Sequence, residues 1–304
     1  MVPKVALNIV PVSGQLMVAA GRRAEELGYE SVWLGEHLFI PAEVTSAYPA
    51  GQGKQPFGAE TPWLDPLLAL AAVAGATDSI RLGVGIHIAP LRHPLLTAKA
   101  FVTLDHVSGG RFDFGWGVGW LRDEFDVLGR DFSRRGKDME EILTVWQKLF
   151  HDAVTTHSGP SFPLPPISFY PKPLPGPRRS RLVGGGYSPV AFDRAARYDG
   201  WYGHLVRLDP STNGGSRWDP VVVKRFTAQM RERRERLGLD PASFEITGAV
   251  LSVPTREQLE VLADAGVDRV VVNPWEMVDG TYVGVAKSLE PAESLATAIG
   301  LSVR

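Results

Sequence analysis

The stretch from Arg81 to Gly129 constrains the fold most strongly, because it has the pattern of two buried strands joined by a helix. Leu82 to Ile88 is largely apolar with two glycines, which is typical of a strand buried on both faces. Pro94 suits the first turn of a helix, where its missing N–H costs nothing, and Arg111 to Trp116 forms the second strand. The stretch therefore predicts a right-handed parallel strand–helix–strand unit.

Both strands of this unit leave through closely spaced glycines. The first exit is Gly83-Val84-Gly85-Ile86-His87 and the second is Gly115-Trp116-Gly117-Val118-Gly119-Trp120. Glycines at strand ends are typical of a bulge, or of a close approach between the backbone and a flat or bulky group. The two exits are therefore the first candidates for a ligand site.

Strands and helices alternate along the rest of the chain as well. This alternation, with glycine breaks after the strands, predicts a (β/α)8 TIM barrel that forms one domain over residues 1–304. Insertions follow strands 2, 4 and 6, the last through Asn213-Gly214-Gly215-Ser216. The alternative is a doubly wound open sheet, but the first strand ends in Val10-Pro11-Val12-Ser13-Gly14 and lacks the glycine fingerprint of that fold. The eight expected strands are Val5–Val10, Ser31–Leu34, Leu82–Ile88, Arg111–Trp116, Arg181–Val183, Gly200–Gly203, Phe244–Leu251 and Arg269–Val272.

The first two insertions differ in character. A long polar loop rich in Gly and Pro runs from Gly35 to Pro62, and loops of that length usually have a function such as covering a pocket. The proline-dense segment from Asp152 to Arg179 is either disordered or packed on the barrel. Its aromatic residues Phe162, Phe169 and Tyr170 favour packing.

Composition excludes several classes of function. The formal net charge of −2 over 304 residues argues against nucleic acid or an anionic membrane as the main partner. The chain has no cysteine, which excludes disulfides, thiolate metal sites and cysteine nucleophiles. We find no secretory leader in the first residues and no apolar run of about 18 residues that would span a membrane. These features predict a cytoplasmic protein that acts on a small molecule.

In a TIM barrel the working residues lie at the C-terminal ends of the strands. One glycine-rich turn there, Gly184 to Ser188, precedes a helix whose N-terminus would present free N–H groups, as suits a phosphate. The alternative is a tight turn that binds nothing. The residues expected at this mouth are Asn8, Glu36, His37, Gly85 to His87, Trp120, Asp123, Gly184 to Tyr187, His204 and Asn273.

Single residues leave more than one interpretation open. His37 follows Glu36 at the end of the second strand and is either a catalytic group or a structural hydrogen-bonding residue; His87 and His93 carry the same ambiguity. Arg111 is expected to pair with a buried acid or with carbonyls, and Trp33 is expected in the core. No acidic or histidine cluster has the spacing of metal ligands. The residues alone predict a barrel enzyme that binds a phosphorylated ligand.

Four segments carry a resemblance to a known family. They are SGGRFDFGWGVGWLRDEF within the 81–129 stretch, WLGEH at 33–37, PWLDPLLALAAVAGAT at 62–77 and LVGGGYSPVAFDRAARYDGW at 182–201. Together they closely resemble the luciferase-like monooxygenase superfamily, and within it the branch that depends on the deazaflavin coenzyme F420. The resemblance covers nearly the whole chain up to Trp201 and is weaker afterwards.

The resemblance implies where the cofactor lies. A bulge with a non-prolyl cis peptide, which backs the isoalloxazine-like ring, falls at Gly85 and Ile86, with His87 next. Such a bond costs about 3–4 kcal/mol and persists where function requires it. Asp123 takes a position that contacts the ring or the ribityl chain. Phosphate contacts fall on Gly185, Gly186 and Tyr187.

The resemblance also implies the catalytic group. His37 matches a histidine that serves as proton donor or shuttle. Glu36 matches the acidic residue before it and, like His87, is expected to contact the cofactor. Related deazaflavin dehydrogenases that act on sugar phosphates or alcohols have a glutamate where this chain has Trp120. An indole cannot transfer a proton, so Trp120 is expected to form a wall of the substrate pocket. Tyr48, in the loop after the second strand, is expected to cover that pocket.

Three functions follow from this resemblance. The first is hydride transfer between coenzyme F420 and a small organic substrate. The second is an FMN-dependent monooxygenase that uses O2, and the third is a non-catalytic flavin-binding protein. Relatives commonly associate through barrel helices, so a homodimer or higher homo-oligomer is expected.

Overall fold

Eight parallel strands close into a barrel in the order β1-β10-β9-β8-β7-β4-β3-β2, which confirms the predicted fold. The computed structural model describes residues 2–10, 12–44, 46, 48, 57–208, 218–275, 277–278, 281–282 and 286–302. The expected strand limits differ from the observed ones by one or two residues, as is usual at strand ends. The barrel strands are β1 Lys4–Asn8, β2 Ser31–Leu34, β3 Arg81–Ile88, β4 Phe112–Gly117, β7 Arg181–Gly185, β8 Gly200–His204, β9 Glu245–Ala249 and β10 Arg269–Val272.

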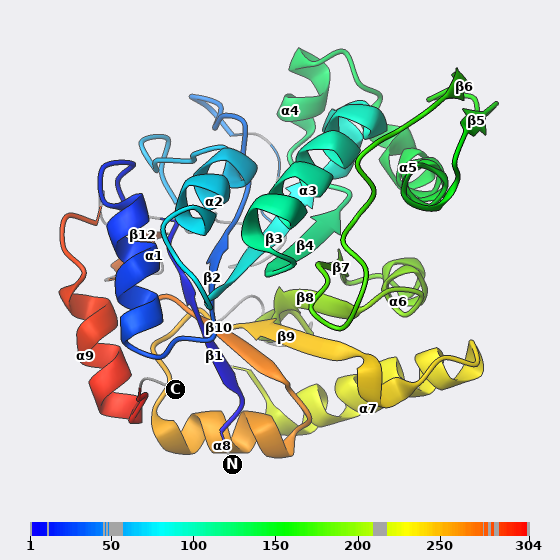
Figure 1. The fold of residues 1–304 in the computed structure, drawn as a ribbon. Helices are drawn as coiled ribbons and strands as arrows, with labels where there is room; N and C mark the ends of the chain where they lie inside the picture. Colours follow the sequence, from blue (N-terminus) through cyan, green and yellow to red (C-terminus); the bar gives the residue numbers. More distant parts are fainter. Residues whose placement is uncertain are drawn as a thin grey trace.

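Helices surround the strands on the outside (Figure 1). The helix between the two glycine-rich exits, α3, starts at Pro94 and ends before Gly109, whose φ of +62° is left-handed. This confirms the strand–helix–strand unit. Figure 1 also shows α9 beside α1. The helices are α1 Met17–Glu26, α2 Pro66–Ala74, α3 Pro94–Ser108, α4 Arg122–Val127, α5 Arg135–His151, α6 Pro189–Ala195, α7 Pro220–Arg236, α8 Arg256–Asp264 and α9 Glu290–Ile299.

The insertion after β4 contains α4, α5 and a small hairpin, β5 Thr155–His157 with β6 Leu164–Ile167. Figure 1 shows this hairpin beside α5, away from the barrel strands. Phe162 and Phe169 are buried, so the proline-dense segment packs as expected, but Tyr170 is 60% exposed and the prediction for that residue was wrong. The expected loop after the sixth barrel strand, at 209–217, lies outside the described residues.

Two aromatic rings fill the inside of the barrel beneath its mouth. Trp33 stacks on Tyr202 with ring centroids 5.1 Å apart and an angle of 8° between the planes. A Cβ added to Gly83 would lie 2.2 Å from the Trp33 ring, and one added to Gly85 would lie 2.3 Å from the Tyr202 ring. Glycines in the first exit therefore make room for the stacked pair, and Trp33 is a core residue as predicted.

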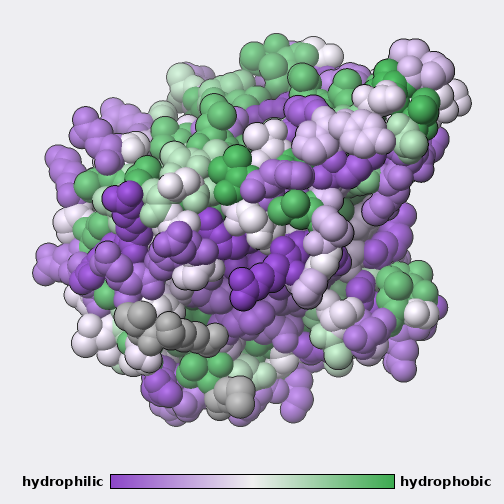
Figure 2. Space-filling model, viewed as in Figure 1, coloured by the Kyte–Doolittle hydropathy of each residue, from purple (hydrophilic) through white to green (hydrophobic). Residues whose placement is uncertain are grey.

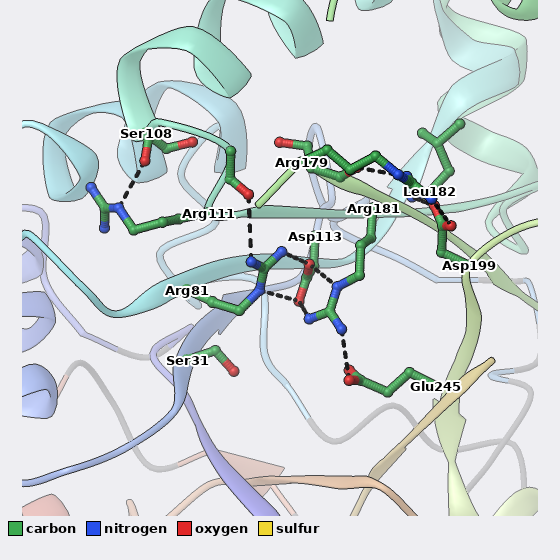
Figure 3. Close-up of polar contacts among 12 residues, drawn as sticks. Ser31, Arg81, Ser108, Arg111, Asp113, Arg179, Arg181, Leu182, Asp199 and Glu245 are labelled. Atoms are coloured by element: carbon green, nitrogen blue, oxygen red, sulfur yellow. Dashed lines mark hydrogen bonds and ion pairs between the residues drawn. The ribbon is translucent and has the colours of Figure 1, made fainter. Parts of the chain in front are cut away.

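The N-terminal end of the barrel is closed by paired charges (Figure 3). Asp113, which is fully buried, accepts two hydrogen bonds from Arg181, at 2.7 and 2.6 Å, and is also bonded by Arg81. Arg269 lies 3.2 Å from the same carboxylate and pairs with Glu30 at 2.7 Å. Although burial alone would raise it, the pKa of Asp113 is strongly lowered by these three guanidinium groups.

Arg111 lies outside this network and confirms its expected role as a carbonyl partner. Its guanidinium is partly buried, and burial lowers its pKa. It holds the loops before β3 and β4 by donating to the backbone carbonyls of Ala74, Thr77, Ile80 and Ser108.

Candidate functional site

The C-terminal mouth of the barrel contains a buried histidine next to a buried carboxylate. His37, three residues beyond β2, has its Nδ1 atom 3.3 Å from Oε1 of Glu124 in the first turn of α4. The same oxygen accepts a hydrogen bond of 2.7 Å from the Leu38 amide. Glu124 is completely buried and His37 is 8% exposed. Nδ1 therefore faces the carboxylate, and Nε2 is the ring nitrogen left for a ligand.

Aromatic rings enclose His37 on its other sides. Its ring centroid lies 5.1 Å from that of Phe57, 4.9 Å from Trp63 and 5.6 Å from Trp120. Tyr48 bridges Phe57 and Trp120, at 5.7 and 5.0 Å. We call Tyr48, Phe57, Trp63 and Trp120 the aromatic box. The structure thus brings together His37, Trp120 and Tyr48, which the sequence placed at one pocket.

Glu36 is adjacent to His37 in the chain but contacts a different set of partners. Its Oε2 accepts 2.6 Å from the Ile88 amide, and its Oε1 lies 3.2 Å from His87 Nδ1 and 2.8 Å from Arg92 Nη2. Burial alone would raise the pKa of the Glu36 carboxyl, but His87, Arg92 and the Ile88 amide hold it at about 2. The acid beside His37 in space is therefore Glu124.

His87 lies in the layer between barrel and helices, not beside the aromatic box. It is 1% exposed, and its ring centroid is 5.2 Å from that of Phe114, which packs on Phe101 of α3 and Trp146 of α5. Together with Glu36 it supports the β3 exit from behind. Contact of either side chain with a cofactor remains a prediction.

The β3 exit has the bulge and the cis bond that the resemblance implies. The Gly85–Ile86 peptide is cis, and the pairing of β3 with β4 shifts register between Val84 and His87. Ile86 is half-buried. A Cβ added to Gly117 would lie 2.3 Å from the Cδ1 atom of Ile86, and one added to Gly185 would lie 2.8 Å from its Cγ2 atom. These two glycines therefore leave space for Ile86 at the exits of three strands.

The glycine turn after β7 lies beside the end of β8. Gly186 has φ +124°, and the Tyr187 hydroxyl accepts a hydrogen bond from the His204 amide. The Arg207 guanidinium lies 3.7 Å above the Tyr187 ring. Burial, together with Arg207, lowers the pKa of His204 to about 4, so its imidazole is neutral near pH 7. The helix predicted after this turn is α6, and the Ser188 hydroxyl caps it by accepting a hydrogen bond of 3.2 Å from the Ala191 amide.

Asp123 precedes Glu124 in the first turn of α4 but faces the loop after β2. Its Oδ2 lies 3.4 Å from the Ser46 hydroxyl, and the side chain is half-buried. It therefore borders the same mouth without touching His37. His93, the other ambiguous histidine, caps α3 by accepting 3.2 Å from the Leu95 amide.

Three residues of this site were missed by sequence reasoning: Glu124, Trp63 and Arg207. Glu124 carried a signal, because it lies three residues after Leu121 and next to Phe125, and all three are fully buried on one side of α4. For Trp63 and Arg207 the only sequence signal was position, since Trp63 lies just before a helix and Arg207 just after the end of a strand. Their roles depend on how the chain closes in space.

The mouth fits a flat, partly polar ring system. Ile86 offers an apolar surface, and Trp63 Nε1 and His204 Nδ1 are buried polar atoms that have no hydrogen-bond partner among the described residues. Buried polar atoms without partners are unusual and are often satisfied by a ligand or by water. In the part of the chain that the structure describes, no group of three or more His, Asp or Glu side chains could hold a metal ion. The described helices also include none that could cross a bilayer.

Known proteins resemble this chain in sequence and in fold. An uncharacterized protein of Mycobacterium tuberculosis is 28% identical over 257 residues, which cover 84% of this chain and 83% of that protein. An F420-dependent secondary alcohol dehydrogenase, solved with an F420–acetone adduct, has a TM-score of 0.75 at 16% identity, with all of both chains covered. EDTA monooxygenase from Chelativorans sp. BNC1 has a TM-score of 0.74 at 12% identity, covering 98% of this chain and 92% of that one.

At these identities the structural matches establish the fold alone. The sequence match to a family model is more specific, because it extends over residues 13–274 and thus over most of the barrel. The chain belongs to the luciferase-like monooxygenase family.

Proposed function

We propose that this protein is an oxidoreductase that transfers a hydride between coenzyme F420 and a small organic substrate, with His37 as the proton partner. The observation that carries the proposal is the buried contact between His37 Nδ1 and Glu124 inside the aromatic box. A proton-transferring group near neutral pH is what such a reaction needs besides its cofactor.

Side chains at the strand exits are suited to hold the cofactor. Ile86 would back the ring, Asp123 would contact the ring or the ribityl chain, and the turn from Gly185 to Tyr187 would take the phosphate. Arg207, above Tyr187, adds a positive charge at that turn. When bound, a deazaflavin supplies a hydride donor or acceptor.

The protein's own part of the chemistry is to hold a proton at a defined atom and to exclude water. His37 gives or takes the proton at Nε2, while the aromatic box shields the site. The rings in contact with His37 are those of Phe57, Trp63 and Trp120, none of which is ionisable at neutral pH. We therefore propose that the reacting end of the substrate is apolar or flat, and not a sugar phosphate.

The alternative function, an FMN-dependent monooxygenase, is supported by the likeness to EDTA monooxygenase. Deazaflavins have carbon in place of a ring nitrogen and do not readily activate oxygen. Purified protein is therefore incubated with either cofactor in reduced form, with and without a substrate panel, while oxygen uptake and cofactor absorbance are followed. We expect substrate-dependent oxidation of reduced F420 without oxygen uptake. Reduced FMN reacts with oxygen by itself, so the alternative would be established by an oxygenated product that forms only when protein, substrate and reduced FMN are all present.

His37→Gln separates both enzymes from a non-catalytic flavin-binding protein. We expect turnover to fall about 10²–10⁴-fold, the usual contribution of a general acid or base, while cofactor binding stays within a factor of three. Lys224→Gln, on an exposed face of α7, is the control and leaves turnover unchanged. Cofactor binding without any turnover in the unaltered protein would favour the binding protein.

We also propose that the chain forms a homodimer through α2 and α3. Leu68 is 74% exposed, Leu96 66% and Val107 52%. Figure 2 shows apolar surface in the upper part of the view, where α2 and α3 lie in Figure 1. Contiguous exposed apolar surface often marks an interface between proteins. Light scattering after size exclusion tests this: a dimer that Leu68→Lys with Leu96→Lys converts to a monomer supports it, and an unaltered protein that is already monomeric excludes it.

A further inference from the structure

Glu124 is buried in a way that stability alone does not explain. Its side chain has no exposed surface, yet no Lys or Arg forms an ion pair with it among the described residues. One oxygen meets the Leu38 amide and His37, and the other, Oε2, is buried without a hydrogen-bond partner. Burying a carboxylate without full pairing is costly, and such groups are retained mainly where they have a function.

The geometry around Glu124 is that of a carboxylate that orients an imidazole. The Leu38 amide and His37 Nδ1 converge on the same oxygen, at 2.7 and 3.3 Å, so the carboxylate is held by the backbone of the segment that carries the histidine. The aromatic box limits rotation of the ring. A carboxylate that accepts from Nδ1–H selects the tautomer in which Nε2 carries the lone pair.

We propose that Glu124 is the positioning residue of this site: it holds His37 in the Nδ1–H tautomer and keeps Nε2 directed at the substrate. This inference rests on the proposed function, in which His37 exchanges a proton with the substrate. When the substrate is oxidised, Nε2 takes up the proton that it releases, and Glu124 offsets the positive charge of the imidazolium. In the reverse direction the same proton returns to the substrate.

The tautomer can be read without any cofactor. In protein labelled with ¹⁵N at histidine, long-range ¹H–¹⁵N spectra show which ring nitrogen of each histidine carries the proton. The His37 signals are assigned as those that are missing from the spectrum of His37→Gln. We expect Nδ1–H in the unaltered protein and in Glu124→Gln, which keeps an acceptor. Glu124→Leu is expected to populate the Nε2–H form. Asp126→Asn, an exposed carboxylate on the same helix, is the control. An unchanged tautomer in a folded Glu124→Leu variant would refute the proposal.

Kinetics supply the second readout. Glu124→Gln keeps an acceptor for Nδ1–H but removes the negative charge that offsets the imidazolium, so we expect kcat to fall by about 10–100-fold, with KM within a factor of two. In a His37→Gln background the same change has no further effect, because Glu124 acts only through His37. Equal losses in both backgrounds would mean that Glu124 is merely structural.

Failure of this inference is distinguishable from failure of the proposed function. If neither cofactor supports turnover, the proposed function is wrong, and the NMR result still decides whether Glu124 orients His37. If turnover occurs and Glu124→Gln retains full kcat, the inference alone is wrong. Should Glu124→Leu not fold, the comparison of Glu124→Gln in the two backgrounds decides.

Discussion

Both ends of the barrel bury carboxylates, but they treat them in opposite ways. At the N-terminal end, Asp113 is fully buried and meets the guanidinium groups of Arg81, Arg181 and Arg269. At the C-terminal mouth, Glu124 is just as buried, but the ionisable group beside it is a histidine and one of its oxygens has no hydrogen-bond partner among the described residues. The two acids are comparable in burial and differ in pairing.

This difference separates stability from function. A carboxylate surrounded by cations has a single protonation state over a wide pH range, which suits a structural network. A carboxylate that faces an imidazole can orient the ring and offset the charge that the ring gains on taking up a proton, which suits a site that must exchange one. In TIM barrels generally, residues at the N-terminal end serve stability and those at the C-terminal end serve catalysis.

The largest expected effect comes from breaking the N-terminal network. Asp113→Leu leaves three guanidinium groups without their shared carboxylate, and we expect a loss of about 3–5 kcal/mol in the free energy of unfolding. Glu124→Gln, at the other end, should change that free energy by less than about 1 kcal/mol. Urea unfolding of both variants measures the contrast. Similar losses from both changes would contradict the division between the two ends.

Acid should weaken the same network. Burial alone would raise the pKa of Glu30, but Arg269 lowers it from the ordinary value of 4.5 to about 2. A lowered folded pKa means that the stabilisation is present above pH 4.5 and is lost as the pH falls towards 2. At 1.36 kcal/mol per pKa unit, this carboxyl contributes about 3 kcal/mol to the free energy of unfolding near neutral pH. The free energy of unfolding, measured between pH 4.5 and pH 2, should fall less steeply with pH in Glu30→Gln than in the unaltered protein. Equal slopes would mean that Glu30 is not a source of the acid sensitivity.

The floor of the mouth should resist even one added methyl group. In Gly85→Ala, the new Cβ would lie 2.3 Å from the Tyr202 ring, which cannot yield easily because it stacks on Trp33. We expect a loss of about 1–3 kcal/mol from overpacking, together with weaker cofactor binding. Gly136, in α5, has nothing within 4 Å of an added Cβ. Gly136→Ala is the control and should stabilise the protein by about 0.5–1 kcal/mol. Equal tolerance at both positions would show that the floor adapts.

The smallest effect is expected in the aromatic box. Trp120→Leu removes a ring that lies 5.6 Å from His37 and 5.0 Å from Tyr48. We expect KM to rise by about 3- to 10-fold, equivalent to 0.5–1.5 kcal/mol of aromatic contact, with kcat changed less. Steady-state kinetics on an identified substrate measures both. A loss confined to kcat would mean that Trp120 acts on the chemical step and not as a pocket wall.

Local sequence patterns predicted the framework of the barrel because each strand, helix and turn is determined mainly by its own residues. The alternation of strand and helix, the start of α3 at Pro94 and the burial of Trp33 all follow from residues within one element or turn. Arg111 was predicted as a possible carbonyl partner from its type alone, because three of its four carbonyl partners lie 31, 34 and 37 positions away. The exposed Tyr170 is the counter-example, because an aromatic residue in a proline-rich segment has no periodicity to indicate its side.

The site was less predictable because it depends on contacts between distant segments. His37 and Glu124 are separated by 87 positions and meet only when β2 and the insertion after β4 reach the same mouth. Glu36, although adjacent to His37 in the chain, pairs with His87 and Arg92. Sequence reasoning identified the histidine and the wall residues, but it had no means of finding Glu124, the acid that lies beside His37 in space.

The central claim is that this mouth holds a deazaflavin. A fluorescence titration of the purified protein with coenzyme F420, and a parallel one with FMN, tests it most directly. We predict saturable binding of F420 that is at least about tenfold tighter than that of FMN, a difference of 1.4 kcal/mol. We also predict that Ile86→Asp, which places a charge where the ring would lie, weakens the binding of F420. Tighter binding of FMN, or F420 binding that Ile86→Asp leaves unchanged, would contradict the claim.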